Sequence, residues 1–75
     1  MYKNIIGLNL RKIRLKNKLS QEQLSARLQM KGLKFDRTTI SKIEVRSRQV
    51  LDYELVHIAE ALKVDIHELV KEDNE

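Results

Sequence analysis

The chain has 75 residues, of which 41% are hydrophobic and 35% charged, and it contains no cysteine and no proline. A domain of this length buries only about 60% of the surface that its unfolded chain exposes, so its stability depends on well-packed apolar side chains. The absence of cysteine excludes disulfides, thiolate catalysis and cysteine-ligated zinc. The longest uncharged run, residues 4–10, is shorter than a membrane span or a signal-peptide core. We therefore expect one soluble, cytoplasmic domain over residues 1–75 with its core in about residues 5–70.

The charges are divided unevenly along the chain. Residues 1–50 contain 13 Lys or Arg and three acidic residues, whereas residues 51–75 contain two Lys and eight acidic residues. The first part therefore carries a net charge of +10 and the second −6, which together give the overall +4. A basic part beside an acidic part indicates a nucleic-acid-binding surface and a surface that faces away from it, although a solubilising role explains charge alone equally well.

Apolar spacing and a capping sequence place the first two helices. A helix over about residues 4–16 is predicted by apolar residues at i, i+4 and i+7, namely Ile6, Leu10 and Ile13. In the segment Ser20–Gln23, the Ser20 hydroxyl and the Gln23 side chain can each bond to the other residue's backbone amide, as in a capping box. A second helix should follow Ser20 and end before Gly32, which tolerates the left-handed conformation that ends helices.

Aspartates mark the starts of three further helices. Asp36 is a good N-cap for a third helix over about residues 37–46. Asp52 and Asp65 are expected to cap a fourth and a fifth helix. Apolar residues at helical spacing give these three helices a buried side, namely Ile40, Ile43, Leu55, Ile58, Ala59, Leu62, Ile66, Leu69 and Val70. Residues 72–75 form a polar tail. The chain is therefore predicted to be all-α.

Five segments of the chain form a recognisable series in their order and spacing. They are Ile6-Gly7, Leu10-Arg11-Lys12-Ile13-Arg14, Leu19-Ser20-Gln21-Glu22-Gln23-Leu24, Thr39-Ile40-Ser41-Lys42-Ile43-Glu44 and Ile58-Ala59-Glu60-Ala61-Leu62-Lys63-Val64. Together they resemble the Cro and phage-repressor (xenobiotic-response-element) helix-turn-helix family over about residues 5–70. The resemblance implies a compact five-helix, lambda-repressor-like domain that binds double-stranded DNA.

The resemblance also implies DNA contacts for particular residues. Gln21 would meet a DNA phosphate at the positively polarised start of the second helix. The third helix would lie in the major groove and read base edges through Arg37, Thr38 and Lys42, with Ser41 beside them. The DNA backbone would be followed by three residues after that helix, namely Arg46, Ser47 and Arg48.

The spacing of the third helix agrees with this assignment. If its two isoleucines are buried, its exposed face carries Arg37, Thr38, Ser41, Lys42 and Val45. Arg37 and Lys42 can donate to guanine O6 and N7, a contact worth about 1–3 kcal/mol of discrimination. Taken outside the motif, such residues more commonly form a solvated helix face.

The chain departs from the family pattern in two places. Residues 29–35 are longer than the usual turn between the second and third helices, and we expect Leu33 and Phe35 to anchor them. Arg46 stands where the family commonly has a glycine. Since arginine resists positive φ by about 1 kcal/mol, the third helix is expected to continue one or two residues beyond Glu44.

Other polar residues are expected to be structural. By the same resemblance, Glu44 should pair with Arg14 and join the first helix to the third. His57 and His67 have no third nitrogen or sulfur ligand, so we expect no metal site. The sequence shows no Ser/His/Asp set, phosphate-cradling glycine loop or spaced carboxylate pair. We therefore expect no cofactor and no enzymatic activity.

These features together predict a small transcriptional regulator. A single domain reads only a few base pairs, so specificity favours a homodimer on an inverted repeat. We expect the dimer contact near Val50, Leu51 and Val70. Two alternatives stay open. One is an antitoxin-like regulator that mainly binds a protein partner, and the other is an interaction module that has kept the fold but no longer binds DNA.

Overall fold

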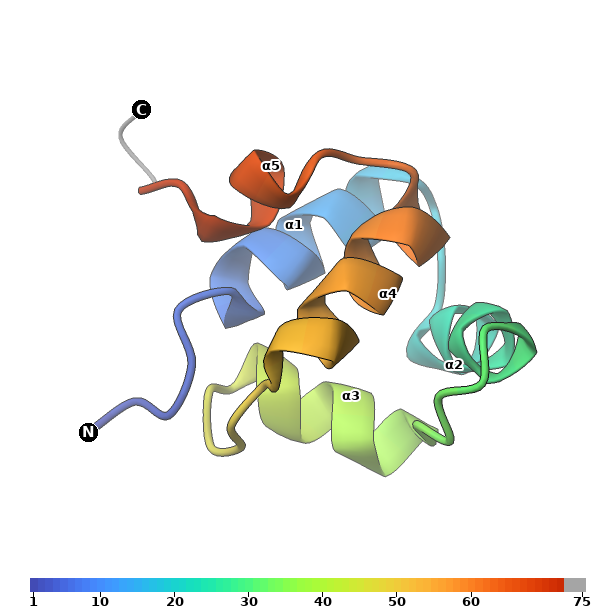
Figure 1. Ribbon diagram of the computed structural model, residues 1–75, viewed down its shortest axis with the longest axis horizontal. Helices are drawn as coiled ribbons and strands as arrows, with labels where there is room; N and C mark the ends of the chain where they lie inside the picture. The colour runs from blue at the N-terminus through green and yellow to red at the C-terminus, as the bar shows by residue number, and fades with distance from the viewer. Residues whose placement is uncertain (73–75) are drawn as a thin grey trace.

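The computed structural model describes residues 1–72, which contain five helices and no strand. The helices are α1 (Gly7–Lys16), α2 (Gln21–Met30), α3 (Arg37–Glu44), α4 (Asp52–Leu62) and α5 (Ile66–Val70) (Figure 1). This confirms the all-α, five-helix prediction. Most of the predicted polar tail, residues 73–75, lies outside the described part of the chain.

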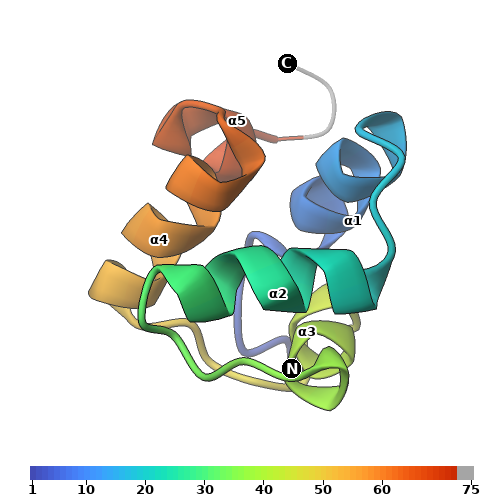
Figure 2. The same cartoon turned by 90° about the vertical axis from the view of Figure 1, so that its right-hand side faces the viewer.

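The five helices pack around a common core. α2 packs against both α3 and α4, α1 packs against α3 and α5, and α4 also contacts α5. Figure 2 shows α2 in front of α3, with α1 and α4 on either side. The consecutive helices α2 and α3 therefore form a helix-turn-helix unit whose back is covered by the other helices.

Apolar side chains of all five helices fill this core, although Ile66 of α5, expected on a buried side, is 36% exposed. Leu24, Leu28, Ile40, Ile43 and Ile58 are each 0% exposed. Fully burying one such side chain stabilises a fold by about 1.5–3 kcal/mol. The burial of both isoleucines in α3 fixes the rotation of that helix and turns its polar face outward.

Two of the predicted helix caps are confirmed in atomic detail. Ser20 Oγ accepts a hydrogen bond from the Gln23 amide at 3.0 Å, and Gln23 Oε1 accepts one from the Ser20 amide at 2.8 Å. At the start of α3, Asp36 Oδ1 accepts from the Thr39 amide at 2.8 Å and from its hydroxyl at 3.0 Å. These bonds from Thr39 lower the pKa of Asp36 below its ordinary value.

Two predicted helix starts are wrong, that of α1 by three residues and that of α4 by one. α1 begins at Gly7 rather than near residue 4, because Asn4 Oδ1 accepts from the amide of Gly7 at 2.9 Å and so caps the helix from outside. Asp52 is the first residue of α4 and not its cap. The N-cap is Leu51, whose amide donates to Glu54 Oε1 at 2.9 Å. The side chains that cap these helices are therefore Asn4, which lies before α1, and Glu54, which lies in the first turn of α4.

Candidate nucleic-acid interface

The polar face of α3 is open to solvent. Arg37, Thr38 and Lys42 are exposed, Ser41 is half-buried, and Val45 beyond the end of the helix is 65% exposed. These side chains form a continuous face opposite the two buried isoleucines of the helix.

The ion pair that Arg37 forms across the turn is weak. Its Nη1 lies 3.9 Å from Glu22 Oε1, and both side chains are at least 70% exposed. A pair this open to water holds its partners only loosely. The Arg37 guanidinium therefore remains available to another ligand.

The long turn before α3 is held by buried contacts. Leu33 and Phe35 are 7% and 5% exposed. The Ser25 hydroxyl in α2 donates to the Phe35 carbonyl at 2.6 Å. Gly32 has a φ of 89°, a conformation that a glycine adopts without strain. The added residues therefore fold against the core and leave α2 and α3 packed against each other.

A buried ion pair joins three helices beside this face. Arg14 of α1 donates to Glu44 of α3 through Nε at 2.7 Å and Nη2 at 3.0 Å. Arg14 Nη1 also donates to the carbonyl of Leu19 at 2.8 Å. Gln21, the first residue of α2, donates from Nε2 to Glu44 Oε1 at 3.1 Å. An amide nitrogen carries two hydrogens, so this bond leaves Gln21 with a second donor.

The end of α3 corrects one sequence prediction. The helix ends at Glu44 and does not continue to residue 46, because Arg46 adopts a φ of 63°. The Arg46 amide still donates to the Ile43 carbonyl at 3.0 Å, and its guanidinium carbon lies 3.4 Å from the centre of the Tyr2 ring. The hydrogen bond to Ile43, which closes the end of the helix, and the stacking on Tyr2 together offset the strain of the left-handed backbone at Arg46. Arg46 is thus turned toward the amino-terminal segment.

The Arg48 side chain is bound to the carboxylate of Glu54. Its guanidinium donates to both carboxylate oxygens of Glu54, at 3.1 and 3.2 Å, and lies 4.8 Å from the centre of the Phe35 ring. Burial opposes ionisation of Glu54, but bonds from Arg48 and from the Leu51 amide outweigh it and lower the pKa of Glu54. The sequence prediction missed this pair, although Glu54 lies six residues after Arg48, across a turn.

Two shallow hollows flank α3. The first, of about 440 Å³, is called here the helix-side hollow and is lined by Tyr2, Leu8, Arg11, Gln21, Ser41, Glu44, Val45 and Arg46. The second, of about 520 Å³, is called the loop-side hollow and is lined by Lys3, Thr39, Lys42, Ser47, Arg48, Gln49 and Leu51. The sequence analysis assigned no role to Arg11. The run of basic residues around Arg11 was the signal in the sequence that could have identified this residue.

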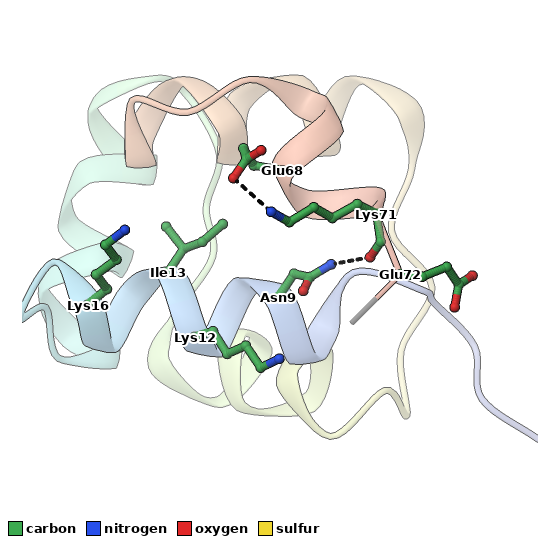
Figure 3. Close-up of a pocket in the computed structure, with 7 residues that line it drawn as sticks. All are labelled: Asn9, Lys12, Ile13, Lys16, Glu68, Lys71 and Glu72. Atoms are coloured by element: carbon green, nitrogen blue, oxygen red, sulfur yellow. Dashed lines mark hydrogen bonds and ion pairs between the residues drawn. The ribbon is translucent and has the colours of Figure 1, made fainter. Parts of the chain in front are cut away.

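A third hollow lies away from α3, between α1 and α5. It has a volume of about 250 Å³, and Figure 3 shows Lys12 and Lys16 of α1 at its edge. Asn9 Nδ2 donates to the Lys71 carbonyl at 2.7 Å, and Lys71 Nζ lies 3.2 Å from Glu68 Oε1. The Asn9 bond joins α1 to the backbone at the end of α5, whereas the Lys71–Glu68 pair lies within the α5 segment. Asn9 therefore helps to hold α5 on α1.

Other kinds of site have no support in residues 1–72. This part of the chain contains no group of three or more His, Cys, Asp or Glu side chains that could hold a metal ion. In the same range, every helix is too short or too polar to cross a membrane.

Three solved structures are similar to the chain in fold. The restriction-modification controller protein C.AhdI from Aeromonas hydrophila is 33% identical, with a TM-score of 0.74 over 85% of this chain and 86% of that one. The hypothetical transcription factor NHTF from Neisseria is 26% identical, with a TM-score of 0.81 over 99% of this chain and 79% of that one. The DNA-binding domain of BldD, at 24% identity and a TM-score of 0.76 over 93% and 94% of the two chains, shares the fold.

The family comparison agrees with the geometry of α2 and α3. No curated protein gives a significant match to the chain. A family model described as "Helix-turn-helix" matches residues 10–69, which include all of α2, α3 and α4. The chain therefore belongs to the Cro and phage-repressor type of helix-turn-helix family, whose members are non-enzymatic DNA-binding regulators.

Proposed function

We propose that the chain is a transcriptional regulator that reads a specific duplex DNA sequence with α3, called the recognition helix from here on. One observation carries this proposal: the open polar face of the recognition helix lies between two hollows that are lined by cationic side chains. A helix in the major groove has a phosphate backbone on either side of it, so base readers need phosphate contacts on both flanks.

Base readout is assigned to Arg37, Thr38 and Lys42. All three are exposed, and the two cations can donate to guanine O6 and N7 while the threonine methyl can meet a thymine methyl. Ser41 is half-buried and lines the helix-side hollow, which suits contact with a phosphate better than contact with a base edge.

Phosphate contacts are assigned to Gln21 on one flank and Ser47 on the other. Glu44 orients the Gln21 amide at the start of α2, where the helix dipole also attracts an anion. Ser47 is exposed, and its hydroxyl donates to the Lys42 carbonyl only over a long 3.3 Å bond. The proposed contact requires the hydroxyl to turn from this carbonyl to the phosphate. Arg46 and Arg48 add positive charge, but their contacts with Tyr2 and Glu54 make them chiefly supports of the loop after the recognition helix.

The assembly that we propose is a homodimer on an inverted repeat. Leu51, Tyr53 and Val56 are 47%, 53% and 41% exposed at the outer side of α4, next to the loop that leaves the recognition helix. A second copy bound there would place two recognition helices on one side of the DNA, as paired half-sites require. Of the three residues expected in this contact, Val50 and Val70 instead pack partly against the core, and only Leu51 is exposed.

Selection of bound sequences from random duplex DNA tests the readout. The wild type is expected to enrich an inverted repeat, and the double variant Arg37→Ala, Lys42→Ala is expected to lose it. The matched control is Lys16→Ala, Lys31→Ala, which removes the same charge outside both hollows and should keep the motif. If the wild type enriches no sequence, the proposal fails and a protein partner becomes the main ligand.

Sedimentation tests the dimer. Val56→Lys is expected to give a monomer that binds only half-sites, because it places a charge in the apolar contact. Leu15→Lys is the control, since Leu15 is an apolar residue of α1 with 53% exposure. A wild type that stays monomeric at high concentration, with and without operator DNA, would exclude the dimer.

A further inference from the structure

The segment before α1 is bound tightly to the end of the recognition helix. The Lys3 amide donates to the Arg46 carbonyl at 3.0 Å. Asn4 Nδ2 donates to the carbonyls of Ile43 and Arg48, at 3.1 and 2.8 Å. Tyr2 stacks on the Arg46 guanidinium at 3.4 Å. Residues on both sides of Lys3 are therefore fixed against the chain that leaves α3.

Close packing at Gly7 reinforces this attachment. A Cβ atom on Gly7 would lie 2.3 Å from the Ile43 carbonyl oxygen and 2.7 Å from Arg46 Cγ. The backbone at the start of α1 thus touches the backbone at the end of the recognition helix. Any movement of the amino-terminal segment relative to that helix would break several contacts at once.

While its backbone is held, the Lys3 side chain is exposed and lines the loop-side hollow. Lys42, which is assigned to a base edge, borders the hollow on the side of the recognition helix, and Ser47 borders it from the following loop. None of its lining residues is acidic. Of the neighbouring carboxylates, Glu54 is bound by Arg48, and Asp36 accepts hydrogen bonds from Thr39. The hollow therefore offers the Lys3 ammonium, a group that binds a phosphate, beside a Ser47 hydroxyl that is held only by a long bond of 3.3 Å.

We infer that the loop-side hollow binds one backbone phosphate of the DNA and that Lys3, which lies outside the helix-turn-helix unit, is a positioning residue for that contact. The inference rests on the proposed function. Lys3 reaches the phosphate from a backbone that is already ordered, so binding orders only the side chain. Its contact sets the register of the recognition helix in the groove without reading a base.

Affinity for the selected operator, measured by fluorescence anisotropy over a range of KCl concentrations, tests this inference. The slope of log K against log salt is negative, and each lost phosphate contact makes it less steep by about 0.9. Lys3→Gln is expected to reduce the steepness by this amount for each copy bound. Between 50 and 200 mM salt, affinity should then fall about 3.5-fold less per copy than in the wild type. Base preference in the selection should not change.

Two variants separate a phosphate contact from other effects. Lys3→Arg keeps the cation and should restore the wild-type slope, whereas a role in folding alone would not depend on charge. Lys16→Gln removes the same charge at the α1–α5 hollow and should leave the slope close to the wild-type value. Thermal unfolding of each variant measures any loss of fold.

The outcomes also distinguish this inference from the proposed function. If the wild type binds its operator with a strong salt dependence and Lys3→Gln has the slope of Lys16→Gln or of the wild type, the Lys3 assignment is overturned and the proposed function stands. If Lys3→Gln changes the selected sequence, Lys3 reads a base and the phosphate assignment is also overturned. If the wild type enriches no sequence, the proposed function itself fails.

Discussion

Glu44, the last residue of the recognition helix, accepts a hydrogen bond from Gln21, the first residue of α2, at 3.1 Å. The same carboxylate holds Arg14 of α1 through two bonds. One buried acid therefore sets the distance between the residue proposed to hold a phosphate and the helix proposed to read the bases. The angle between α2 and α3 depends on this acid as well as on the hydrophobic core.

Replacing Glu44 should strongly destabilise the fold. In Glu44→Gln, Arg14 keeps a charge that is only 9% exposed and has lost its ionic partner. Breaking such a pair costs about 3–5 kcal/mol. Urea denaturation measures this change. Glu60→Gln is the control, because Glu60 is 54% exposed and its pair with Lys31 spans 3.8 Å; its loss should be below about 1 kcal/mol. Equal losses in the two variants would contradict this account of Glu44.

A methyl group at Gly7 should separate α1 from the recognition helix. In Gly7→Ala the new Cβ meets a backbone carbonyl at 2.3 Å, which cannot move as a flexible side chain would. We expect a loss of about 1–3 kcal/mol from overpacking, which exceeds the gain of about 0.5–1 kcal/mol that alanine brings within a helix. The melting temperature reports the result, and Lys16→Ala on the same helix should change it little. An unchanged or higher melting temperature for Gly7→Ala would show that the contact relaxes freely.

Glycine should have different effects at two positions with positive φ. Arg46 and Lys63 have φ values of 63° and 59°. Lys63→Gly should raise stability by up to about 1 kcal/mol because it removes left-handed strain. Arg46→Gly removes the same strain but also the stacking on Tyr2, worth about 0.5–1 kcal/mol, so its net effect should be close to zero. Urea midpoints compare the variants, and Lys63→Ala, which keeps the strain, should show no gain. A clear gain in Arg46→Gly would mean that Tyr2 adds nothing.

Acid should weaken the Arg48–Glu54 pair. The pKa of Glu54 in the folded chain lies below its ordinary 4.5. The pair therefore stabilises the fold fully above about pH 4.5, and this contribution disappears as pH falls through the lower folded pKa. Stability measured by urea denaturation should decrease between neutral pH and pH 3.

A variant at Glu54 separates the contribution of the Arg48–Glu54 pair to stability from the contributions of other carboxylates. Glu54→Gln should lose about 1–3 kcal/mol at neutral pH, because Arg48 and the Leu51 amide lose a charged acceptor. Its stability should then fall less than that of the wild type on acidification. A residual fall is expected from Asp36, whose pKa is also lowered. If the stability of the variant and that of the wild type depend on pH in parallel, the acid sensitivity comes from groups other than Glu54.

The helices and their inward faces were readable from local sequence. Ser20 with Gln23 predicted the capping box, and Ile40 with Ile43 predicted which side of the recognition helix is buried. These features follow from a few neighbouring residues, since capping bonds and helical periodicity act over one or two turns. The exposure of Arg37, Thr38 and Lys42 follows from the same periodicity.

Only the tertiary structure decided what happens where distant segments meet. The helix ends at Glu44 because Tyr2 and Lys3, more than forty residues earlier, bind the left-handed Arg46. Arg48 faces Glu54 and Phe35, although its sequence position marks it for the DNA backbone. Local propensity cannot predict such contacts, because a charged side chain in a loop takes the partner that folding brings near. The sequence by itself thus determined the helices and the exposed polar face of α3. The packing of the amino-terminal segment and of Glu54 in α4 decided how Arg46 and Arg48 are held beside that face.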